Sequence, residues 1–289
     1  MSLAIAITGF EGIVLAADSR ATIHSQIATP AGQPLLLPST FDNANKLFQV
    51  SRQPFVGVVT FGLAAIGNQQ PRTAHTYFPE FEATIEEYNP SLPDTRQTVQ
   101  AVAQKLSDFF MQKWQAGGMP NLPPAGNDML FLVAGYDRGE VFGRVYSITI
   151  PSKPTPTLIL PSGVFGATWG GQQETADRLL NGFDTKTVEL ARTFLQTPLA
   201  SPGPPIDPLV TDLRGKLSAK IPWQFLPLQD AVHLAIFLIK TTIALQKWTL
   251  DIRGVGGHIN VATIIPTTGF SAVQMHKISG ESIETLTSR

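Results

Sequence analysis

Short runs in which apolar and polar positions alternate, rich in β-branched residues, mark most of the strands expected in this chain. Gly9 and Gly12 separate the first two runs and predict a hairpin at the start of the chain. The expected strands are Ser2–Ile7, Ile13–Asp18, Leu47–Val50, Val56–Phe61, Met129–Tyr136, Val141–Ile150, Asn260–Ile265 and Ala272–Ile278. Strand pairs that follow each other this closely along the chain favour antiparallel sheets.

Apolar residues at helical spacing occupy much of the chain between these strands. The segment from Thr22 to Asn45 is different, because three prolines and a glycine interrupt any regular pattern. We expect an exposed loop there, with Leu35–Leu37 extended. The expected helices are Gly67–Tyr88, Thr95–Gln115, Gln172–Leu180, Thr187–Leu195, Asp207–Lys220 and Ala231–Trp248.

The order of elements is strands, helices, strands, helices and strands. It is not the strict alternation of a parallel doubly wound sheet, and no short repeat is present. This order favours an α+β fold in which two antiparallel sheets pack between outer helices, a four-layer αββα sandwich. We expect a single domain over residues 1–289, with a proline-rich insertion at about 197–225.

Composition narrows the class of protein without identifying it. The 289 residues are 43% hydrophobic and 15% charged, and the formal net charge of −1 gives no reason to expect nucleic acid or an anionic membrane as partner. The absence of cysteine excludes a disulfide framework, a thiolate metal site and a cysteine nucleophile, and it favours a cytoplasmic location. The start lacks the features of a signal peptide. The apolar Ala231–Leu245 stretch falls short of a bilayer-spanning length and predicts a buried helix.

Sequence motifs of several other chemistries are missing. The chain has no G-x-S-x-G elbow, no P-loop and no H-E-x-x-H metal motif. Its five histidines are scattered, and its four tryptophans are not interleaved with basic residues as in a nucleic-acid stacking platform.

Ser2 is the first candidate for chemistry. If Met1 is removed, Ser2 becomes the amino terminus, so that one residue carries a hydroxyl nucleophile and an amine base together. A free α-amino group has a reference pKa of about 7.7–8.0, close to working pH, and can activate a hydroxyl without a histidine. The start of the chain therefore predicts an amidohydrolase that uses its own first residue.

Several segments of the chain share features with one known family. They are Ser2–Ile5, Gly12–Thr22 (GIVLAADSRAT), Asn45–Val50 (NKLFQV) and Gly57–Gly62 (GVVTFG). Together they resemble the proteasome β-subunit family of N-terminal-nucleophile hydrolases, and Gly256–Val261 (GGHINV) extends the resemblance more loosely. The resemblance covers residues 2–67 best.

The resemblance assigns roles to three charged or polar residues. Ser2 takes the place of the family's N-terminal threonine, Lys46 that of its active-site lysine, and Asp18 that of the lysine's carboxylate partner. Taken alone, Lys46 is typical of a surface residue at a strand edge, and Asp18 with Arg20 of a solvated charged pair. Asp18, however, closes the apolar Leu15–Ala17 run, and a buried acid needs a partner.

The resemblance also implies an oxyanion donor and a substrate pocket. The backbone N–H of Gly62 takes the oxyanion role, although a glycine after a strand is also typical of a turn. Thr22, Thr60 and Phe61 match wall positions of the substrate pocket, and a wall of this kind favours an uncharged or apolar substrate side chain.

Three positions depart from the family's pattern. The family's supporting aspartate corresponds to Asp251, which lies one residue too far from the Gly256–Gly257 pair for an ungapped match. Val255 stands where the family has a serine, and the Thr168–Gln172 segment lacks a second serine, for which Thr168 is the expected substitute.

The sequence thus predicts a proteasome-like peptidase of the threonine-type family that forms an acyl-enzyme on Ser2 and acts on peptides or unfolded proteins. Two alternatives stay open: an amide hydrolase of the same superfamily that acts on small molecules, and a catalytically silent structural subunit. The resemblance implies a homo-oligomer, in a ring or a related assembly, and leaves open an unfoldase partner that the sequence does not identify. The expected chemistry needs no metal and no organic cofactor.

Overall fold

A computed structural model of the chain describes residues 2–28, 34–92, 95–124, 126–196, 206–250 and 253–277. Its first five-stranded sheet has the order β12-β1-β2-β13-β14, with every neighbouring pair antiparallel. The strands are β1 (Leu3–Thr8), β2 (Ile13–Asp18), β12 (Gly166–Gly171), β13 (Ile259–Ile265) and β14 (Gly269–Gln274). The predicted hairpin at the start of the chain is thus the β1–β2 pair.

A second five-stranded antiparallel sheet has the order β11-β10-β9-β6-β5. Its strands are β5 (Leu47–Gln49), β6 (Val56–Gly62), β9 (Met129–Gly135), β10 (Arg144–Ile150) and β11 (Lys153–Leu160). The mixture of helices with antiparallel sheets that the sequence predicts is confirmed.

The alternation of residues along β1 explains how the sheets pack. Leu3, Ile5 and Ile7 enter a core against the helices, whereas Ala4 and Ala6 face the second sheet. The small alanines meet larger side chains of the second sheet, among them Val59 and Leu132. Both faces of the strand are therefore buried, as expected for a central strand between two cores.

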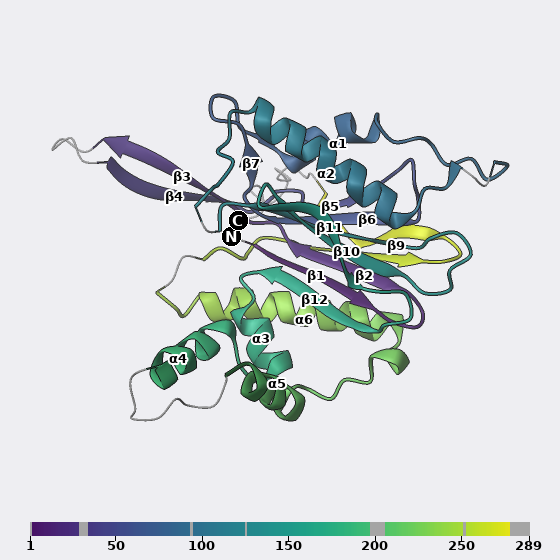
Figure 1. Cartoon of the computed structure of the whole chain (residues 1–289). Coiled ribbons are helices and arrows are strands. Elements are labelled where there is room, and N and C mark those ends of the chain that lie inside the picture. Colours follow the sequence, from purple (N-terminus) through teal and green to yellow (C-terminus); the bar gives the residue numbers. More distant parts are fainter. Residues whose placement is uncertain are drawn as a thin grey trace, which may run out of the picture.

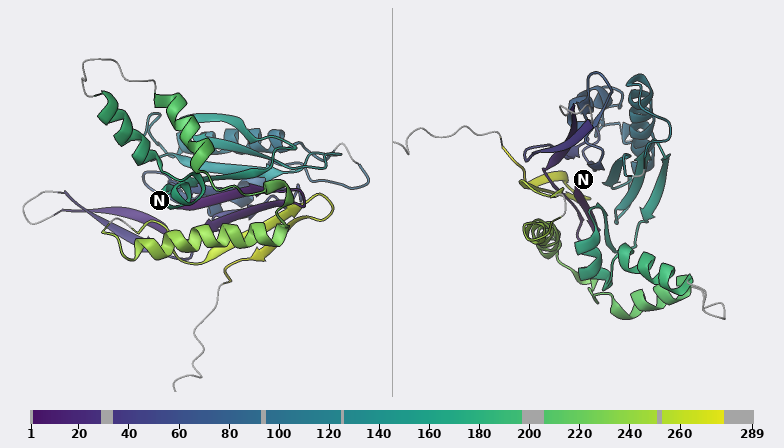
Figure 2. Two further views of the ribbon diagram at one scale, coloured as in Figure 1. Left: turned by 90° about the horizontal axis from the view of Figure 1, so that it is seen from below. Right: turned by 90° about the vertical axis from the view of Figure 1, so that its left-hand side faces the viewer.

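Helices cover the outer face of each sheet (Figure 1). A core of aromatic and aliphatic side chains joins the second sheet to α1 (Ala74–Glu82) and α2 (Val99–Ala116). The first sheet packs against α3 (Glu174–Asn181) and α6 (Leu228–Gln246). In the left view of Figure 2 α6 runs along the first sheet, and in the right view it is seen end-on.

Helix α6 is longer than the predicted Ala231–Leu245 stretch. At 19 residues it is long and apolar enough to cross a membrane, by length and composition alone, so the prediction that it falls short of that length is wrong. One face of the helix is buried against β1, β2, β13 and α3. The buried side chains are Ala231, Val232, Ala235, Leu238, Ile239 and Thr242.

The expected loop between Thr22 and Asn45 is instead largely a two-stranded ribbon. Strand β3 (Ala21–Ala28) pairs with β4 (Pro34–Phe41), and the ribbon projects from the body (Figure 1). Pro34 and Pro38 are four residues apart, so both lack an N–H on the same edge of β4. In a two-stranded ribbon each strand has one edge without a partner strand, and a proline is tolerated there. The prolines predicted a loop, but they are compatible with an edge strand.

Two other predictions need correction. The helix expected over Gly67–Tyr88 is only α1, because the chain first forms the short β7 (Ala65–Ile66) and β8 (Arg72–Thr73) pair. The pattern also missed β11 and β12, whose prolines and glycines are typical of breaks. Strand β11 lies at the edge of its sheet, where proline is tolerated.

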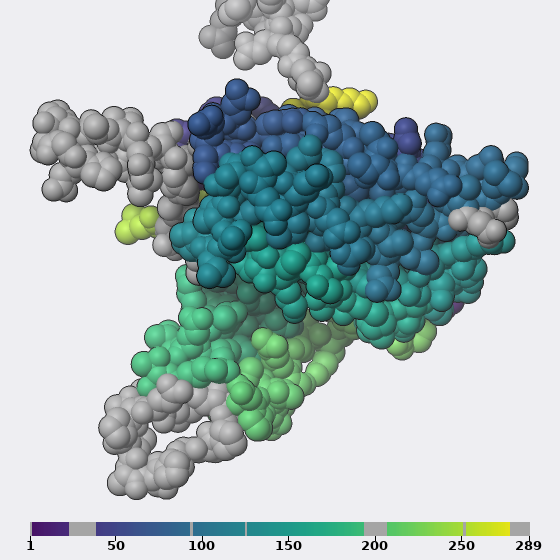
Figure 3. All heavy atoms as spheres, turned by 45° about the horizontal axis from the view of Figure 1, so that its top comes forward, coloured from purple at the N-terminus to yellow at the C-terminus, as the bar shows by residue number. Residues whose placement is uncertain are grey.

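The region around the predicted insertion is largely helical where it is described. It contains α4 (Thr185–Gln196), α5 (Ile206–Leu217) and the 3-10 helix η2 (Trp223–Phe225), while residues 197–205 lie outside the described part of the chain. The N–H of Ala219 donates to the carbonyl of Leu180, which ties the end of this region to α3. In the space-filling view this part projects from the body (Figure 3).

Candidate active site

Ser2, Asp18 and Lys46 meet at one end of the two packed sheets. Ser2 has the same parity as Ala4 and Ala6, so its side chain points to the side of β1 that faces the second sheet. Asp18 ends β2, and Lys46 directly precedes β5 of the second sheet. All three residues are buried.

Lys46 is the centre of this group. Its Nζ lies 2.8 Å from Ser2 Oγ, 2.8 Å from Asp18 Oδ1 and 2.6 Å from the carbonyl oxygen of Arg20. A lysine ammonium has three donors and no acceptor, and here each donor has one acceptor. Burial lowers the pKa of Lys46 below its ordinary value, while the carboxylate of Asp18 acts in the opposite direction.

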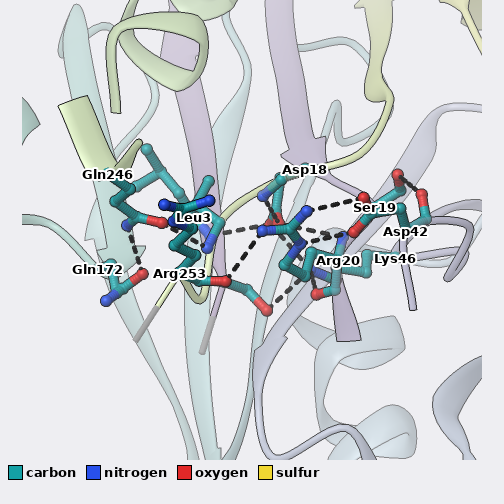
Figure 4. A network of polar contacts seen from close by, with 12 residues as sticks. Leu3, Asp18, Ser19, Arg20, Asp42, Lys46, Gln172, Gln246 and Arg253 are labelled. Atoms are coloured by element: carbon teal, nitrogen blue, oxygen red, sulfur yellow. Dashed lines mark hydrogen bonds and ion pairs between the residues drawn. The ribbon is translucent and has the colours of Figure 1, made fainter. Parts of the chain in front are cut away.

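Asp18 is fully enclosed and receives four hydrogen bonds. Its Oδ1 accepts from Lys46 Nζ and from the N–H of Leu3 at 3.0 Å. Its Oδ2 accepts from the N–H of Arg20 at 3.1 Å and from the N–H of Gly256 at 3.0 Å. A buried carboxylate is stable only with such a complete set of partners, so Asp18 holds the lysine and two chain segments together (Figure 4).

A cavity of about 230 Å³ opens beside this group, lined by Ser2 and Lys46. The predicted pocket residues Thr22, Thr60, Phe61 and Gly62 line the same cavity. Its remaining lining residues are Arg20, Ala21, Asn43, Ala44, Asn45, Leu63, Ala64, Thr73, Ala74 and His75.

Two of the cavity's threonines differ in their hydrogen bonding. Thr60 Oγ1 donates to the carbonyl of Leu130 at 3.0 Å, so its hydroxyl stabilises the pairing of β6 with β9. Thr22 Oγ1 is buried and has no partner among the described residues. Buried polar atoms are normally paired, so this hydroxyl is an exception in a residue that lines the cavity.

Gly62 has a φ of +81°, in the left-handed region that favours glycine. A Cβ at this position would also collide with the backbone oxygen of Asp128. A residue with a side chain would therefore be strained at this position.

Arg20 is part of the site, although its position near Asp18 in the sequence is also typical of a solvated charged pair. Its guanidinium donates to both oxygens of Asp42, from Nε at 2.5 Å and from Nη2 at 2.7 Å, and Nη1 donates to the carbonyl of Arg253 at 3.1 Å. Asp42 directly follows β4, so Arg20 joins the base of the ribbon to the segment that carries Gly256. Its position two residues after Asp18 was the only local signal.

Of the three positions that depart from the family's pattern, two lie in the described part of the chain. Asp251 lies outside the described residues. Thr168 pairs with Ala6, four residues along β1 from Ser2, which at about 3.3 Å per residue is too far to support the nucleophile. Val255 lies next to Gly256, whose N–H donates to Asp18. At the other end of the Thr168–Gln172 segment, just beyond β12, the N–H of Gln172 donates to the carbonyl of Ser2 at 2.7 Å.

In the described part of the chain, residues with side chains suited to metal binding do not gather. Among the described residues, no group of three or more histidine, aspartate or glutamate side chains is placed to hold a metal ion.

No protein-family model matches the chain, and no curated protein matches it. Among solved structures it is similar to an Anbu (Gly-1) mutant from Hyphomicrobium sp. strain MC1, with 14% identity, a TM-score of 0.52, and coverage of 98% of this chain and 90% of that one. It is also similar to the helical assembly of the Anbu complex from Pseudomonas aeruginosa, with 16% identity, a TM-score of 0.52, and coverage of 94% and 86%. At these identities the likeness establishes a shared fold.

Proposed function

We propose that this chain is a proteasome-like N-terminal-nucleophile hydrolase, which cleaves peptide bonds through an acyl-enzyme on Ser2 after Met1 is removed. One observation carries the proposal: Lys46 Nζ lies 2.8 Å from both Ser2 Oγ and Asp18 Oδ1, at the wall of a cavity. A buried lysine against a serine hydroxyl is an unusual and costly arrangement, typical of an activated nucleophile.

The contacts of Lys46 support the amine of Ser2 as the proton acceptor. In the ammonium form all three donors of Lys46 have an acceptor, one of them Ser2 Oγ, and this form has no lone pair to accept the proton of that hydroxyl. The remaining base is the amine that Ser2 gains when Met1 is removed. The ammonium of Lys46 stabilises negative charge on Oγ and so makes the hydroxyl easier to deprotonate.

The reaction then has two steps. The amine of Ser2 takes the hydroxyl proton, directly or through a water, and Oγ attacks the substrate carbonyl, while the N–H of Gly62 donates to the oxyanion. The proton passes to the leaving amine as the C–N bond breaks and an ester forms on Oγ. Water, deprotonated by the same amine, attacks the ester and breaks its bond to Oγ. Oγ takes the proton back from the amine, the acid is released, and Ser2 is restored.

The cavity supports an uncharged or apolar substrate side chain. Phe61 and the alanines Ala64 and Ala74 supply apolar surface there, and the unpaired Thr22 Oγ1 supplies one hydrogen-bonding group. Thr22, Thr60 and Phe61 are therefore the proposed substrate-binding residues, and Asp251 remains a proposed supporting residue.

The fold and surface support the wider proposal. One apolar core lies between the two sheets, and one lies between each sheet and its helices. This arrangement supports a four-layer sandwich in one domain that includes the helical insertion. The outer face of α6 exposes Phe237, and Trp248 just beyond the helix is also exposed, which supports burial in a homo-oligomer, as does the fold shared with a helical assembly. We also propose a cytoplasmic location.

Two alternatives each rest on one observation. A cavity of about 230 Å³ suits a single side chain or a small acyl group, which favours an amide hydrolase acting on small molecules. Val255 at an expected serine favours a silent structural subunit, and assembly without any reaction at Ser2 is the result that would support it.

Hydrolysis of fluorogenic peptides tests the proposal. We expect the protein without Met1 to hydrolyse peptides with an apolar residue before the scissile bond, and a Ser2→Ala variant to lose this activity while keeping its oligomeric state. Hydrolysis of small amides but not of peptides would favour the first alternative. Equal activity of wild type and Ser2→Ala would contradict the assignment of the nucleophile.

A further inference from the structure

We infer that Gln172 and Gln246 are positioning residues for the nucleophile, because their side-chain amides complete a closed ring of hydrogen bonds through Ser2 and Asp18. The catalytic consequence of this inference rests on the proposed function, whereas the ring itself does not. We call the contact between the two side chains the amide bridge.

The peptide group between Ser2 and Leu3 is held at both ends. Its carbonyl oxygen accepts from the N–H of Gln172 at 2.7 Å, and its N–H donates to Asp18 Oδ1 at 3.0 Å. Gly171 allows this approach, because a Cβ there would overlap the Ser2 carbonyl. The position of Oγ therefore depends on where Gln172 and Asp18 are held.

The amide bridge links these two anchors. Gln246 Nε2 donates to Gln172 Oε1 at 2.6 Å (Figure 4), and Gln246 Oε1 accepts from the N–H of Val255 at 3.1 Å. The next residue, Gly256, donates its N–H to Asp18 Oδ2 at 3.0 Å. The ring thus runs from Ser2 through Gln172, Gln246 and the Val255–Gly256 segment to Asp18, and back to Ser2 through Leu3.

Glutamine suits both positions for a chemical reason. Gln246 must accept from a backbone N–H and donate to another side chain, and an amide does both at once. Three successive hydrogen bonds also have the same direction: Val255 donates to Gln246, Gln246 donates to Gln172, and Gln172 donates to Ser2. Hydrogen bonds aligned in this way strengthen one another in a partly buried site.

The ring joins segments that lie far apart in the sequence. Gln246 is the last residue of α6, and Gln172 follows the end of β12. These are the neighbourhoods in which the expected supporting serines are replaced, by Val255 and by a segment without serine. The amide bridge supplies a different support for the same end of the sheet.

Substitutions separate the bridge from general stability. Gln246→Met and Gln172→Met keep the side-chain length and remove the bridge. Gln172→Glu keeps an oxygen that accepts from Gln246 Nε2 and should restore it. Gln229→Met is the matched control, because Gln229 lies exposed on the same helix α6 and bonds to His233.

The rate of Ser2 acylation by a β-lactone probe is measured as a function of probe concentration. We expect both Met variants to lower the limiting rate about tenfold, since small displacements of a nucleophile are costly, with a less than twofold change in the half-saturating concentration. Gln172→Glu should recover at least a third of the wild-type rate, and Gln229→Met should match wild type. Wild-type limiting rates in both Met variants would overturn the positioning role.

Hydrogen exchange of the 253–257 segment gives a readout that needs no activity. Gln246→Met should speed exchange of its amides, since Val255 loses its acceptor. If the wild-type protein does not acylate at all, the proposed function fails and the catalytic role fails with it, while unchanged exchange in Gln246→Met would overturn the ring itself.

Discussion

The two ends of the β1–β2 pair lie in the same strands but differ in what holds them. At one end Ser2, Asp18 and Lys46 are buried, and every oxygen of Asp18 and donor of Lys46 is matched. At the other end Phe10, in the turn between the strands, contacts Phe142 and Phe165 at ring-centroid distances of 5.4 and 6.3 Å. This aromatic end lies at the surface, where Phe10 is 60% exposed.

The difference predicts how each end responds to change. In the polar end each group depends on its partners, because a buried charge that loses one is left uncompensated. In the aromatic end, removal of one ring costs only the contacts of that ring. We therefore expect the polar end to carry the function, which needs groups held in fixed positions, and the aromatic end to tolerate substitution.

The largest effect is expected when the polar end loses its cation. Lys46→Met leaves the Asp18 carboxylate buried without its ion-pair partner and Ser2 without the ammonium, so unfolding should become easier by about 3–5 kcal/mol and hydrolysis should fall at least about a thousandfold. Chemical denaturation and peptide hydrolysis measure the two effects. The double variant Asp18→Asn with Lys46→Met should recover part of the stability and none of the activity.

A smaller effect is expected from a methyl group at the oxyanion position. Gly62→Ala places a Cβ on a residue in the left-handed region, against the backbone of Asp128. We expect the free energy of unfolding to fall by about 1–3 kcal/mol and the hydrolysis rate to fall about a hundredfold. Gly139→Ala is the matched control, because Gly139 also has a positive φ, of +77°, but a Cβ there meets no neighbouring atom. Equal loss of activity in both variants would contradict a role for Gly62 in the site.

The pH dependence sharpens the contrast because activity and stability should move in opposite directions. Burial lowers the pKa of Lys46 below 10.5, so the ammonium is lost, and activity falls, before that pH is reached. In the window between the lowered pKa and 10.5 the unfolded chain binds more protons than the folded one, so the contribution of Lys46 to stability rises with pH. Hydrolysis rates and urea unfolding across this range measure both, and an alkaline limb at or above pH 10.5 would count against Lys46 as its source.

The smallest effect is expected at the aromatic end. Phe10→Ala removes contacts with two rings at an exposed position and should cost about 1 kcal/mol of stability. Peptide hydrolysis by this variant should equal that of wild type. A marked loss of activity would mean that the two ends are coupled through β1 and β2, and the comparison would then fail.

The sequence allowed much of the polar end to be predicted. The buried Ile13–Asp18 run requires a partner for its terminal acid, and the family resemblance implied that Lys46 and Ser2 lie beside it. In the structure Lys46 contacts both Asp18 and Ser2. The strands β1, β2, β6 and β9 were predicted close to their bounds for a similar reason, since their side chains alternate between two buried faces.

Other parts carry no local signal. The amide bridge joins Gln172 to Gln246, 74 residues apart, and neither glutamine is unusual in its own segment. The contact of Arg20 with Asp42 depends on the β3–β4 ribbon, which proline predicted as a loop. Edge strands such as β11 tolerate proline because their outer N–H groups have no partner to lose.

Peptide mapping by mass spectrometry after treatment with a β-lactone probe tests the central claim most directly. The account predicts a chain that begins at Ser2 and carries one probe group on that residue, with no label in Ser2→Ala and much slower labelling in Lys46→Met. A chain that keeps Met1, or one that begins at Ser2 and takes up no probe there, would contradict Ser2 as the nucleophile.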